Sequence, residues 1–270
     1  MLVTVDTGGT KTLVASFSED GILGEQIRLE TPHNEHEYLK LLHETIAEHY
    51  PTEDIEALII ALPGRIDESG VLIDAPNLGW QNIDLHAELS IYYTCPILIE
   101  NDANLAGLAE ARQLSPVPDK CLYITVSTGI GTGIITKGHI DPAYEQSEGG
   151  RMLLTHNGNT MPWQDFASGK AIHEIYGMYG RDITDDQIWH DIAANISVGL
   201  IPLIDSIKPD VVVVGGSIGT YFDRYREPLI DSLKVQLDHV PTVIAAQHPE
   251  QAVIYGCYYY ALDSLTTDAS

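Results

Sequence analysis

One turn near the start of the chain constrains the fold more than any other feature. The stretch TVDTGGTKTLVASF, residues 4–17, has an apolar run on each side of Gly8 and Gly9, which predicts two strands joined by a tight hairpin turn. Asp6 stands near the end of the first strand, and glycines let backbone amides approach a ligand closely. The stretch is therefore typical of a plain hairpin and also of a hairpin that holds a metal-bound phosphate.

The same device occurs again in the second half of the chain. In CLYITVSTGIGTGIITKG, residues 121–138, an apolar strand enters a turn of hydroxyls and glycines and leaves it as another strand. A third glycine turn, VVVVGGSIG, follows the expected strand Val211–Val214 and precedes a helical segment. Three such turns favour a site for nucleotide phosphates, because each can present bare backbone amides to phosphate oxygens. The recurrence also indicates two similar α/β halves that face each other rather than a short-period solenoid.

The common nucleotide-binding motifs do not account for these turns. Gly169-Lys170 is the only Gly-Lys pair in the sequence, and it lacks the upstream glycine spacing and the Ser or Thr of a P-loop. The run that begins at Gly129 reads GxGxG and leads into a strand, so it is not a dinucleotide-binding fingerprint. A nucleotide held between two glycine hairpins implies instead a cleft between the two halves.

Strand-like runs and helical patterns alternate along the chain, which predicts an α/β architecture. The expected strands are Leu2–Val5, Leu13–Phe17, Ala57–Leu62, Ile97–Ile99, Leu122–Val126, Gly133–Thr136 and Val211–Val214. The expected helices are Glu35–Tyr50, Ala103–Arg112, Gly169–Met178, Asp186–Ser206, Asp223–Val235 and Gln251–Leu265. Pro202, near the end of the fourth of these helices, predicts a kink there, because proline has no amide proton to donate.

The composition restricts the classes of function. A chain of 270 residues with 44% apolar residues suits one large domain or two modest ones with a full core. The 14 basic residues stand against 39 acidic ones and give a formal charge of −25. Such a surface repels nucleic acid and anionic membranes, so neither is expected as a partner.

The cysteines and the first residues lead to an expected localisation. Cys95, Cys121 and Cys257 are far apart and odd in number, so neither a disulfide framework nor a CxxC metal pair is expected. The chain starts with an expected strand, LVTV, without the basic and long apolar regions of a signal peptide, and no apolar run reaches membrane-spanning length. We therefore expect a cytoplasmic protein.

Taken in order, the motifs of this chain resemble those of ROK-family sugar kinases, which belong to the actin-like ATPase superfamily together with hexokinases and acetate kinase. The similar stretches cover nearly the whole chain: DTGGTKT at 6–12 and STGIGTG at 127–133 (phosphate motifs), GGS at 215–217 (adenosine motif), ALPGRID at 61–67 and APNLGW at 75–80 (sugar side), ENDAN at 100–104 (catalytic motif) and EGGR at 148–151 (the family's Glu-x-Gly-His). The resemblance implies two ribonuclease-H-like domains, residues 1–101 and 102–249, with the active site in the cleft between them. It also implies a C-terminal helix, about 250–266, that returns to the first domain.

The resemblance assigns roles to individual residues. Those implied for binding the nucleotide and its phosphates are Gly8, Gly9, Thr10, Lys11, Thr128, Gly129, Gly131, Gly215, Gly216 and Ser217. Those implied for binding the sugar are Gly64, Arg65, Asn101, Asp102, Glu148, Arg151 and Gln164. Two of these residues have a plainer interpretation, since Lys11 is also typical of a solvated hairpin lysine and Arg65 of a surface loop.

Elementary chemistry independently supports a catalytic carboxylate in the stretch PILIENDANLAGLAEAR. It predicts a strand that ends at Asn101-Asp102 and a helix that follows, so the Asp102 carboxylate lies at the C-terminal end of a strand, where open α/β sheets bind ligands. Phosphoryl transfer to a sugar needs a base that takes the hydroxyl proton, which makes Asp102 the predicted catalytic residue. The alternative is that Asn101 and Asp102 only cap the helix. Asp6 would orient magnesium through water, because magnesium keeps most of its water shell.

The chain departs from the family pattern where most members carry a zinc site. The family's Cys-x-Cys-Gly-x-x-Gly-Cys motif corresponds here to THNGNTMPWQDFASGKAI, which has no cysteine, and Pro162 stands where the last zinc cysteine would be. Arg151 replaces a histidine that is usually a zinc ligand, so we expect no zinc, and His156 alone in a polar loop does not make a site. Gln164 stands in the position of a sugar-binding glutamate, which leaves the identity of the sugar open.

These features predict an ATP- and magnesium-dependent sugar kinase that transfers the γ-phosphoryl group to a hexose, with the 6-hydroxyl of glucose or a close relative as the expected acceptor. Two alternatives stay open. One is a non-catalytic sugar-binding regulator, because the family includes repressors; these carry an N-terminal helix-turn-helix, and no basic segment precedes the first strand here. The other is a polyphosphate-using glucokinase, which would need a basic channel, against a charge of −25. A homodimer is compatible with each of these readings.

Overall fold

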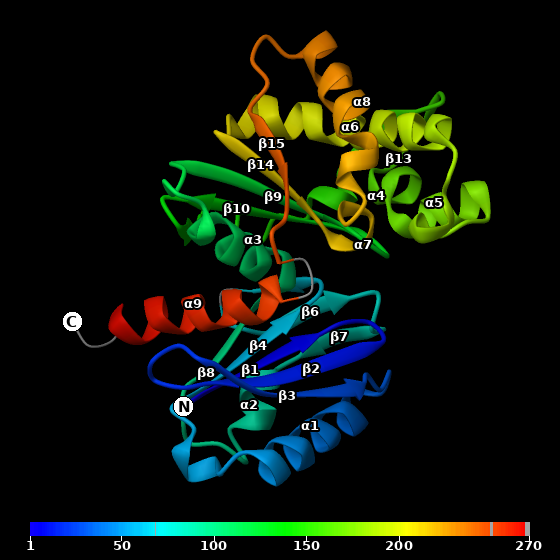
Figure 1. Ribbon diagram of the computed structural model, residues 1–270. Helices are drawn as coiled ribbons and strands as arrows, with labels where there is room; N and C mark the ends of the chain where they lie inside the picture. Colours follow the sequence, from blue (N-terminus) through cyan, green and yellow to red (C-terminus); the bar gives the residue numbers. More distant parts are fainter. Residues whose placement is uncertain (68, 249–250, 268–270) are drawn as a thin grey trace. The chain divides into compact units, whose positions relative to one another are not determined.

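The computed structural model describes residues 1–67, 69–248 and 251–267, which form two compact units (Figure 1). Unit 1 contains Met1–Ala109 and the segment from Ala252 onward, and unit 2 contains Glu110–Gln251. The boundary falls inside the helix α3 (Asp102–Gln113), whereas the sequence prediction set it where this helix begins.

The main sheet of unit 1 has five strands in the order β3-β2-β1-β4-β8. These strands are β1 (Leu2–Thr7), β2 (Lys11–Phe17), β3 (Leu23–Glu30), β4 (Ala57–Leu62) and β8 (Ile97–Asn101). β1 pairs antiparallel with β2 and parallel with β4, and β4 pairs parallel with β8. The carboxyl ends of β1, β4 and β8 therefore lie along one edge of the sheet.

Helices cover both faces of this sheet because its central strands are buried on both sides. All six residues of β4 are buried, as a central parallel strand requires. The helices α1 (Glu35–His49) and α2 (Leu85–Leu89) join one core with apolar residues of the sheet, while α9 (Ala252–Thr267) packs against β1 and β4 (Figure 1). A 3-10 turn, Thr52–Asp54, connects α1 to β4.

A second, small sheet extends unit 1. Its order is β5-β6-β7, with β5 (Arg65–Ile66), β6 (Leu72–Ala75) and β7 (Trp80–Ile83). Trp80 fixes this sheet to the core, since its buried ring lies 4.8 Å from the Tyr38 ring and its indole nitrogen donates to the His33 carbonyl oxygen at 2.7 Å.

Unit 2 repeats the plan of unit 1. Its main sheet has the order β11-β10-β9-β14-β15, again with antiparallel pairs at one side and parallel pairs at the other. The strands are β9 (Lys120–Val126), β10 (Ile130–Thr136), β11 (His139–Ile140), β14 (Val211–Gly215) and β15 (Thr242–Ala245). The predicted α/β architecture with two similar halves is thereby confirmed.

The other elements of unit 2 are mostly helical. They are α4 (Gln164–Ala167), α5 (Gly169–Tyr176), α6 (Asp186–Ile207), α7 (Gly216–Gly219), α8 (Phe222–Gln236), the 3-10 turns Gly149–Arg151 and Gly180–Asp182, and a hairpin of β12 (Leu153–His156) and β13 (Asn159–Pro162). The apolar stripe of α6 packs with α8 into the core of the unit (Figure 1). None of the described helices is long and apolar enough to cross a membrane.

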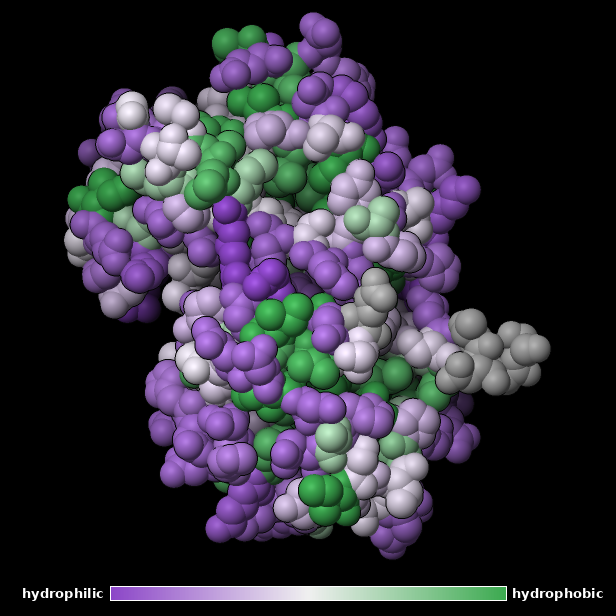
Figure 2. Space-filling model, turned by 180° about the vertical axis from the view of Figure 1, so that it is seen from behind, coloured by the Kyte–Doolittle hydropathy of each residue, from purple (hydrophilic) through white to green (hydrophobic). Residues whose placement is uncertain are grey.

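The differences from the sequence prediction concern short or polar elements. The strands β3 and β15, the small sheet, the β12–β13 hairpin and α2 were not expected. The helix α6 continues past Pro202 to Ile207. Hydrophilic residues cover much of the face in Figure 2, in keeping with the 39 acidic residues of the chain.

Candidate active site

Three acidic side chains gather at the carboxyl edge of the unit 1 sheet. Asp6 in β1 is in register with Ala61 in β4, and Ala61 with Glu100 in β8. Residues in register on parallel strands point to the same face, so Asp6 and Glu100 share one face of the sheet. Asp102 comes directly after the end of β8 and is the first residue of α3. The first glycine turn and the predicted catalytic motif thus meet at one edge of one unit.

Burial changes the chemistry of this face. It raises the pKa of Asp6 to about 6, although the side chain keeps part of its surface exposed. Cys257 in α9 is fully buried, and this burial, together with the charges of Asp6 and Glu100, raises the pKa of its thiol well above the ordinary value. Cys257 is therefore inert at neutral pH, whereas Asp6 is mainly ionised there.

Asp6 fits a magnesium ion that is held mainly by phosphates and water. Magnesium prefers oxygen ligands and is usually bound through one or two carboxylates plus substrate phosphates. Within residues 1–67, 69–248 and 251–267, no group of three or more His, Cys, Asp or Glu side chains is arranged to hold a metal ion. Magnesium needs few protein ligands, and a partly exposed carboxylate beside a glycine turn can serve as one of them.

The first glycine turn joins β1 to β2. The Gly8 amide donates to the Lys11 carbonyl oxygen at 2.9 Å, and a Cβ atom on Gly8 would lie 3.0 Å from that oxygen. A Cβ atom on Gly9 would lie 3.3 Å from the Asn77 carbonyl oxygen. Thr10 and Lys11 are exposed. The turn is tight and presents polar groups to solvent, as a phosphate-binding hairpin requires.

The β8–α3 junction orients Asp102. The side-chain oxygen of Asn101 accepts the amide protons of Ala103 at 2.8 Å and Asn104 at 3.2 Å, so Asn101 caps the helix. Its side-chain nitrogen donates to the Gly64 carbonyl oxygen at 2.9 Å. One oxygen of Asp102 accepts the Ala103 amide at 2.8 Å, and the side chain remains partly exposed. Capping is thus mainly the work of Asn101, and the Asp102 carboxylate is held at the start of the helix.

The predicted sugar-side residues of unit 1 border the small sheet. Gly64 has a φ of +104°, and a Cβ atom there would overlap the Asp74 carbonyl oxygen, so only glycine fits. Arg65 in β5 donates from Nε to Oδ1 of Asp74 in β6 at 2.8 Å. Arg65 is therefore an ion-paired strand residue with an exposed side chain rather than a loop arginine.

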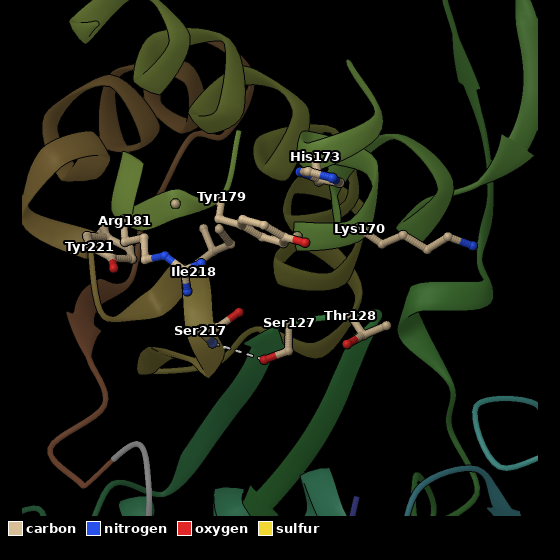
Figure 3. Close-up of a pocket in the computed structure, with 11 residues that line it drawn as sticks. Ser127, Thr128, Lys170, His173, Tyr179, Arg181, Ser217, Ile218 and Tyr221 are labelled. Carbon is tan, nitrogen blue, oxygen red and sulfur yellow. Dashed lines mark hydrogen bonds between the residues drawn. The ribbon is translucent and has the colours of Figure 1, made fainter. Parts of the chain in front are cut away.

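Unit 2 contains a cavity of about 450 Å³ beside the second glycine turn (Figure 3). The hydroxyl residues Ser127, Thr128 and Ser217 lie together along one side of it. Tyr179, Arg181, Ile218 and Tyr221 are among the residues that line the rest, and Lys170 points outward from α5. The cavity therefore has a hydroxyl-lined part and an aromatic part.

Backbone contacts join the segments around this cavity. The Ser217 amide donates to Ser127 Oγ at 2.9 Å, and the Gly169 amide donates to the Ser127 carbonyl oxygen at 2.6 Å. Gly216 has a φ of +81°, and a Cβ atom there would lie 2.6 Å from the Val126 carbonyl oxygen and 2.7 Å from Ser127 Oγ. The second and third glycine turns of the sequence thus lie together at the ends of β9 and β14. Gly131 lies within β10, and Gly215 is the last residue of β14.

The aromatic part of the cavity was missed by sequence reasoning. Tyr179 stacks on His173, with ring centroids 4.3 Å apart, and the Arg181 guanidinium lies 4.9 Å from the Tyr179 ring centroid. These residues come from α5 and from the connection after it, which has neither helical nor strand periodicity. The sequence does contain a signal for this aromatic part, because the stretches MYGRD and GGSIGTY each place a tyrosine close to glycines.

The predicted sugar-side residues of unit 2 lie near the start of β10. Arg151 Nε is 3.9 Å from Glu148 Oε2, and the Gly149 amide donates to Thr132 Oγ1 at 3.1 Å. Gln164 contacts the second glycine turn, because its Oε1 would be 2.9 Å from a Cβ atom on Gly129. Glu148, Arg151 and Gln164 thus flank the turn that borders the cavity.

The segment without zinc ligands forms a hairpin rather than the polar loop expected around His156. Its turn residues Asn157 and Gly158 have φ values of 50° and 78°, which is the geometry of a tight two-residue β-turn. The His156 ring stacks on Phe166 with centroids 4.3 Å apart, and Asn157 Nδ2 is 2.9 Å from His156 Nε2. Pro162 ends β13. Side-chain packing therefore organises this segment.

The comparisons with known proteins agree with this fold. The ROK family model matches residues 2–264, so the chain belongs to the ROK family. The glucokinase of Thermotoga maritima is 33% identical over 301 residues, which covers 94% of this chain and 95% of that enzyme. The fructokinase of Pediococcus pentosaceus is 25% identical over 241 residues, 81% of this chain and 80% of that enzyme. Xylose repressors also match, and that of Bacillus subtilis does so over 59% of this chain.

A solved structure carries the same fold. The ROK glucokinase from Streptomyces griseus, in complex with glucose and AMPPNP, superposes with a TM-score of 0.81 and 22% identity, over 95% of this chain and 97% of that chain. The chain therefore has the two-domain, actin-like ATPase fold of ROK glucokinases, as the motifs predicted.

Proposed function

We propose that the protein is an ATP- and magnesium-dependent sugar kinase that transfers the γ-phosphoryl group of ATP to a hexose hydroxyl, such as the 6-hydroxyl of glucose. The cavity of unit 2 carries this proposal, because it combines a hydroxyl-lined glycine turn with an aromatic part, as a bound nucleotide requires. Membership in a family that includes glucokinases and fructokinases supports it.

In this proposal unit 2 holds the nucleotide. The rings of Tyr179 and Tyr221 offer flat apolar surfaces to a nucleobase. Ser127, Thr128 and Ser217 offer hydroxyls and backbone amides to the ribose and phosphate oxygens, with Gly129 and Gly216 allowing close approach. The ATP analogue bound to the Streptomyces griseus glucokinase supports ATP as the donor.

Unit 1 supplies the charges for the transfer. Magnesium, when bound with ATP, would neutralise charge on the phosphates, and the Asp6 carboxylate would orient its water shell. The amides of Gly9 and Thr10 would donate to phosphate oxygens at the exposed turn, which the hydrogen bond from Gly8 to Lys11 closes, and the Lys11 side chain would add a positive charge.

Asp102 would act as the general base. Its carboxylate is held at the start of α3 by the Ala103 amide and is partly exposed, so a sugar hydroxyl could approach it and donate its proton. The proposed sugar-binding residues offer polar groups to sugar hydroxyls: Gly64, Arg65 and Asn101 in unit 1, and Glu148, Arg151 and Gln164 in unit 2.

The test is sugar-dependent ADP release from ATP and magnesium over a panel of glucose, fructose, mannose and N-acetylmannosamine. The proposal expects turnover with at least one of these hexoses, and a phosphorylated sugar as the second product. A parallel run with polyphosphate as the donor tests the polyphosphate-kinase alternative. Saturable sugar binding by calorimetry without turnover from either donor would instead favour a sugar-binding regulator, which the matches to xylose repressors keep as the second candidate.

A further inference from the structure

Glu100 is a buried carboxylate next to the predicted base and has no role in the chemistry described above. Its exposed fraction is 4%. Its Oε1 accepts the Asn101 amide proton at 2.6 Å and a proton of Asn104 Nδ2 at 3.0 Å. Burying a carboxylate away from water is costly unless hydrogen-bond donors surround it, so these two bonds contribute to holding Glu100 in place.

The bonds of Glu100 bracket Asp102 in the sequence. One bond holds the backbone of Asn101, which precedes Asp102, and the other holds the side chain of Asn104, which follows Asp102 by two residues. Asn101 in turn binds the amides of Ala103 and Asn104 and the carbonyl oxygen of Gly64. Every residue from 101 to 104 is therefore part of one connected set of hydrogen bonds, with Glu100 at its buried end.

We propose that Glu100 is a positioning residue for phosphoryl transfer: it holds the Asn101–Asn104 segment so that the Asp102 carboxylate meets the acceptor hydroxyl. The proposal rests on the kinase function proposed above. Glu100 itself is buried and acts through Asn101 and Asn104. Because a misplacement of about 1 Å at a reacting group can cost about 100-fold in rate, loosening this segment should lower kcat far more than it changes nucleotide binding.

The chain offers a matched control for a merely structural role. Glu110, also in α3, is 1% exposed and accepts the amide protons of Gln247 at 2.8 Å and His248 at 2.9 Å. It is thus a second buried carboxylate that holds backbone amides, but it contacts neither Asp102 nor its neighbours in these bonds. Loss of either carboxylate should destabilise the fold, and only loss of Glu100 should disturb the base.

The experiment compares Glu100→Ala, Glu100→Gln, Glu110→Ala and Glu110→Gln in the full chain. Glu100→Ala should lower kcat by about 100-fold with the KM for ATP within about twofold of wild type. Glu100→Gln should recover kcat to within about fivefold, because glutamine keeps one oxygen for the Asn101 amide. Both Glu110 variants should keep kcat within about threefold, with a lower unfolding temperature in Glu110→Ala. Equal losses of kcat in Glu100→Ala and Glu110→Ala would overturn the proposal.

Amide hydrogen exchange provides a readout that does not depend on turnover. In Glu100→Ala, exchange in peptides that cover residues 98–105 should become at least tenfold faster while peptides of β1 and β4 keep their protection. Unchanged exchange at 98–105 in a folded variant would overturn the positioning role, even if the wild type proves not to be a kinase. Absence of turnover in the wild type, with faster exchange in Glu100→Ala, would contradict the kinase function and leave the holding role of Glu100 supported.

Discussion

The two main sheets have the same strand plan, but different side chains surround the corresponding turns. In unit 1 the turn between β1 and β2 lies at an edge with three acidic residues, Asp6, Glu100 and Asp102. In unit 2 the turn between β9 and β10 lies beside the hydroxyls of Ser127 and Ser217 and an aromatic cavity. One backbone frame thus serves two chemistries, and we infer that unit 1 supplies charge and a base while unit 2 supplies nucleotide binding.

The largest effect is expected from Asp102, the proposed base, in unit 1. Asp102→Asn should keep the fold and lower kcat by ~10²–10⁴-fold, because an amide does not accept the hydroxyl proton as a carboxylate does. Asp84→Asn is a matched control, since Asp84 also accepts an amide proton at the start of a helix, from Ala87 at 2.8 Å. Steady-state kinetics measure both variants. If Asp102→Asn retains more than about a tenth of wild-type kcat with sugar binding intact, Asp102 is not the base.

The matching change in unit 2 should affect affinity rather than turnover. Gly216→Ala forces a side chain into a positive φ and against the Val126 carbonyl oxygen and Ser127 Oγ. Overpacking of this kind costs about 1–3 kcal/mol, so the KM for ATP should rise about tenfold or more while kcat stays within a few fold. Gly158→Ala isolates the strain, because Gly158 also has a positive φ of 78° but nothing lies within 4 Å of its Cβ position. Equal KM values for both variants would contradict a role of Gly216 in nucleotide binding.

The glycine turns, but not the nearby cavity, could be recognised in the sequence. Asp6, Gly8, Thr128 and Ser217 belong to local patterns, in which apolar runs alternate with glycines and hydroxyls, and such patterns predict strand ends. Tyr179 and Arg181 approach the cavity only because α5, the connection after it and α7 fold together, and no local pattern carries that information. The stretch PILIENDANLAGLAEAR did predict a strand that ends at Asn101-Asp102 and a helix that follows it.

Short and polar elements were missed for physical reasons. The edge strand β3, LGEQIRLE, is mostly exposed, so it lacks a clear apolar face. The β12–β13 hairpin was missed although Asn157-Gly158 is a strong two-residue turn signal, because the missing zinc ligands favoured a loop there. The kink expected at Pro202 is not tested by the helix bounds, but α6 does continue to Ile207.

The buried charge of Asp6 should make stability depend on pH. Burial raises the Asp6 pKa from the ordinary 3.8 to about 6, so the folded state holds an extra proton between these values and loses stability as pH rises through that window. Asp6→Asn should therefore be more stable than wild type at pH 8 without ligands, by roughly 1–3 kcal/mol, and the difference should vanish near pH 4. Unfolding midpoints at both pH values measure this.

Asp67 provides the opposite case as a control. Hydrogen bonds from the Ser69 hydroxyl and the Val71 amide lower its pKa, so Asp67→Asn should be slightly less stable than wild type at pH 8. A stability of Asp6→Asn equal to that of wild type at pH 8 would contradict the burial of a charge at Asp6.

The smallest effects are expected at Arg151 and Gln164, the proposed sugar-binding residues of unit 2. Arg151→His and Gln164→Glu, alone and together, should change the ratios of kcat/KM among glucose, mannose and N-acetylmannosamine by about fivefold, because a single polar contact contributes about 1 kcal/mol. Gln26→Glu, at an exposed position of β3, controls for added charge. The same ranking in all of these proteins would show that Arg151 and Gln164 do not face the substrate.

The division of labour between the two units is tested most directly by titrating a non-hydrolysable ATP analogue, with magnesium, into Asp102→Asn and Gly216→Ala. Calorimetry should give Asp102→Asn a Kd within about twofold of wild type and Gly216→Ala a Kd about tenfold weaker or more, which corresponds to at least ~1.4 kcal/mol. A tenfold loss of affinity in Asp102→Asn, or an unchanged Kd in Gly216→Ala, would contradict the assignment of the base to unit 1 and of the nucleotide to unit 2.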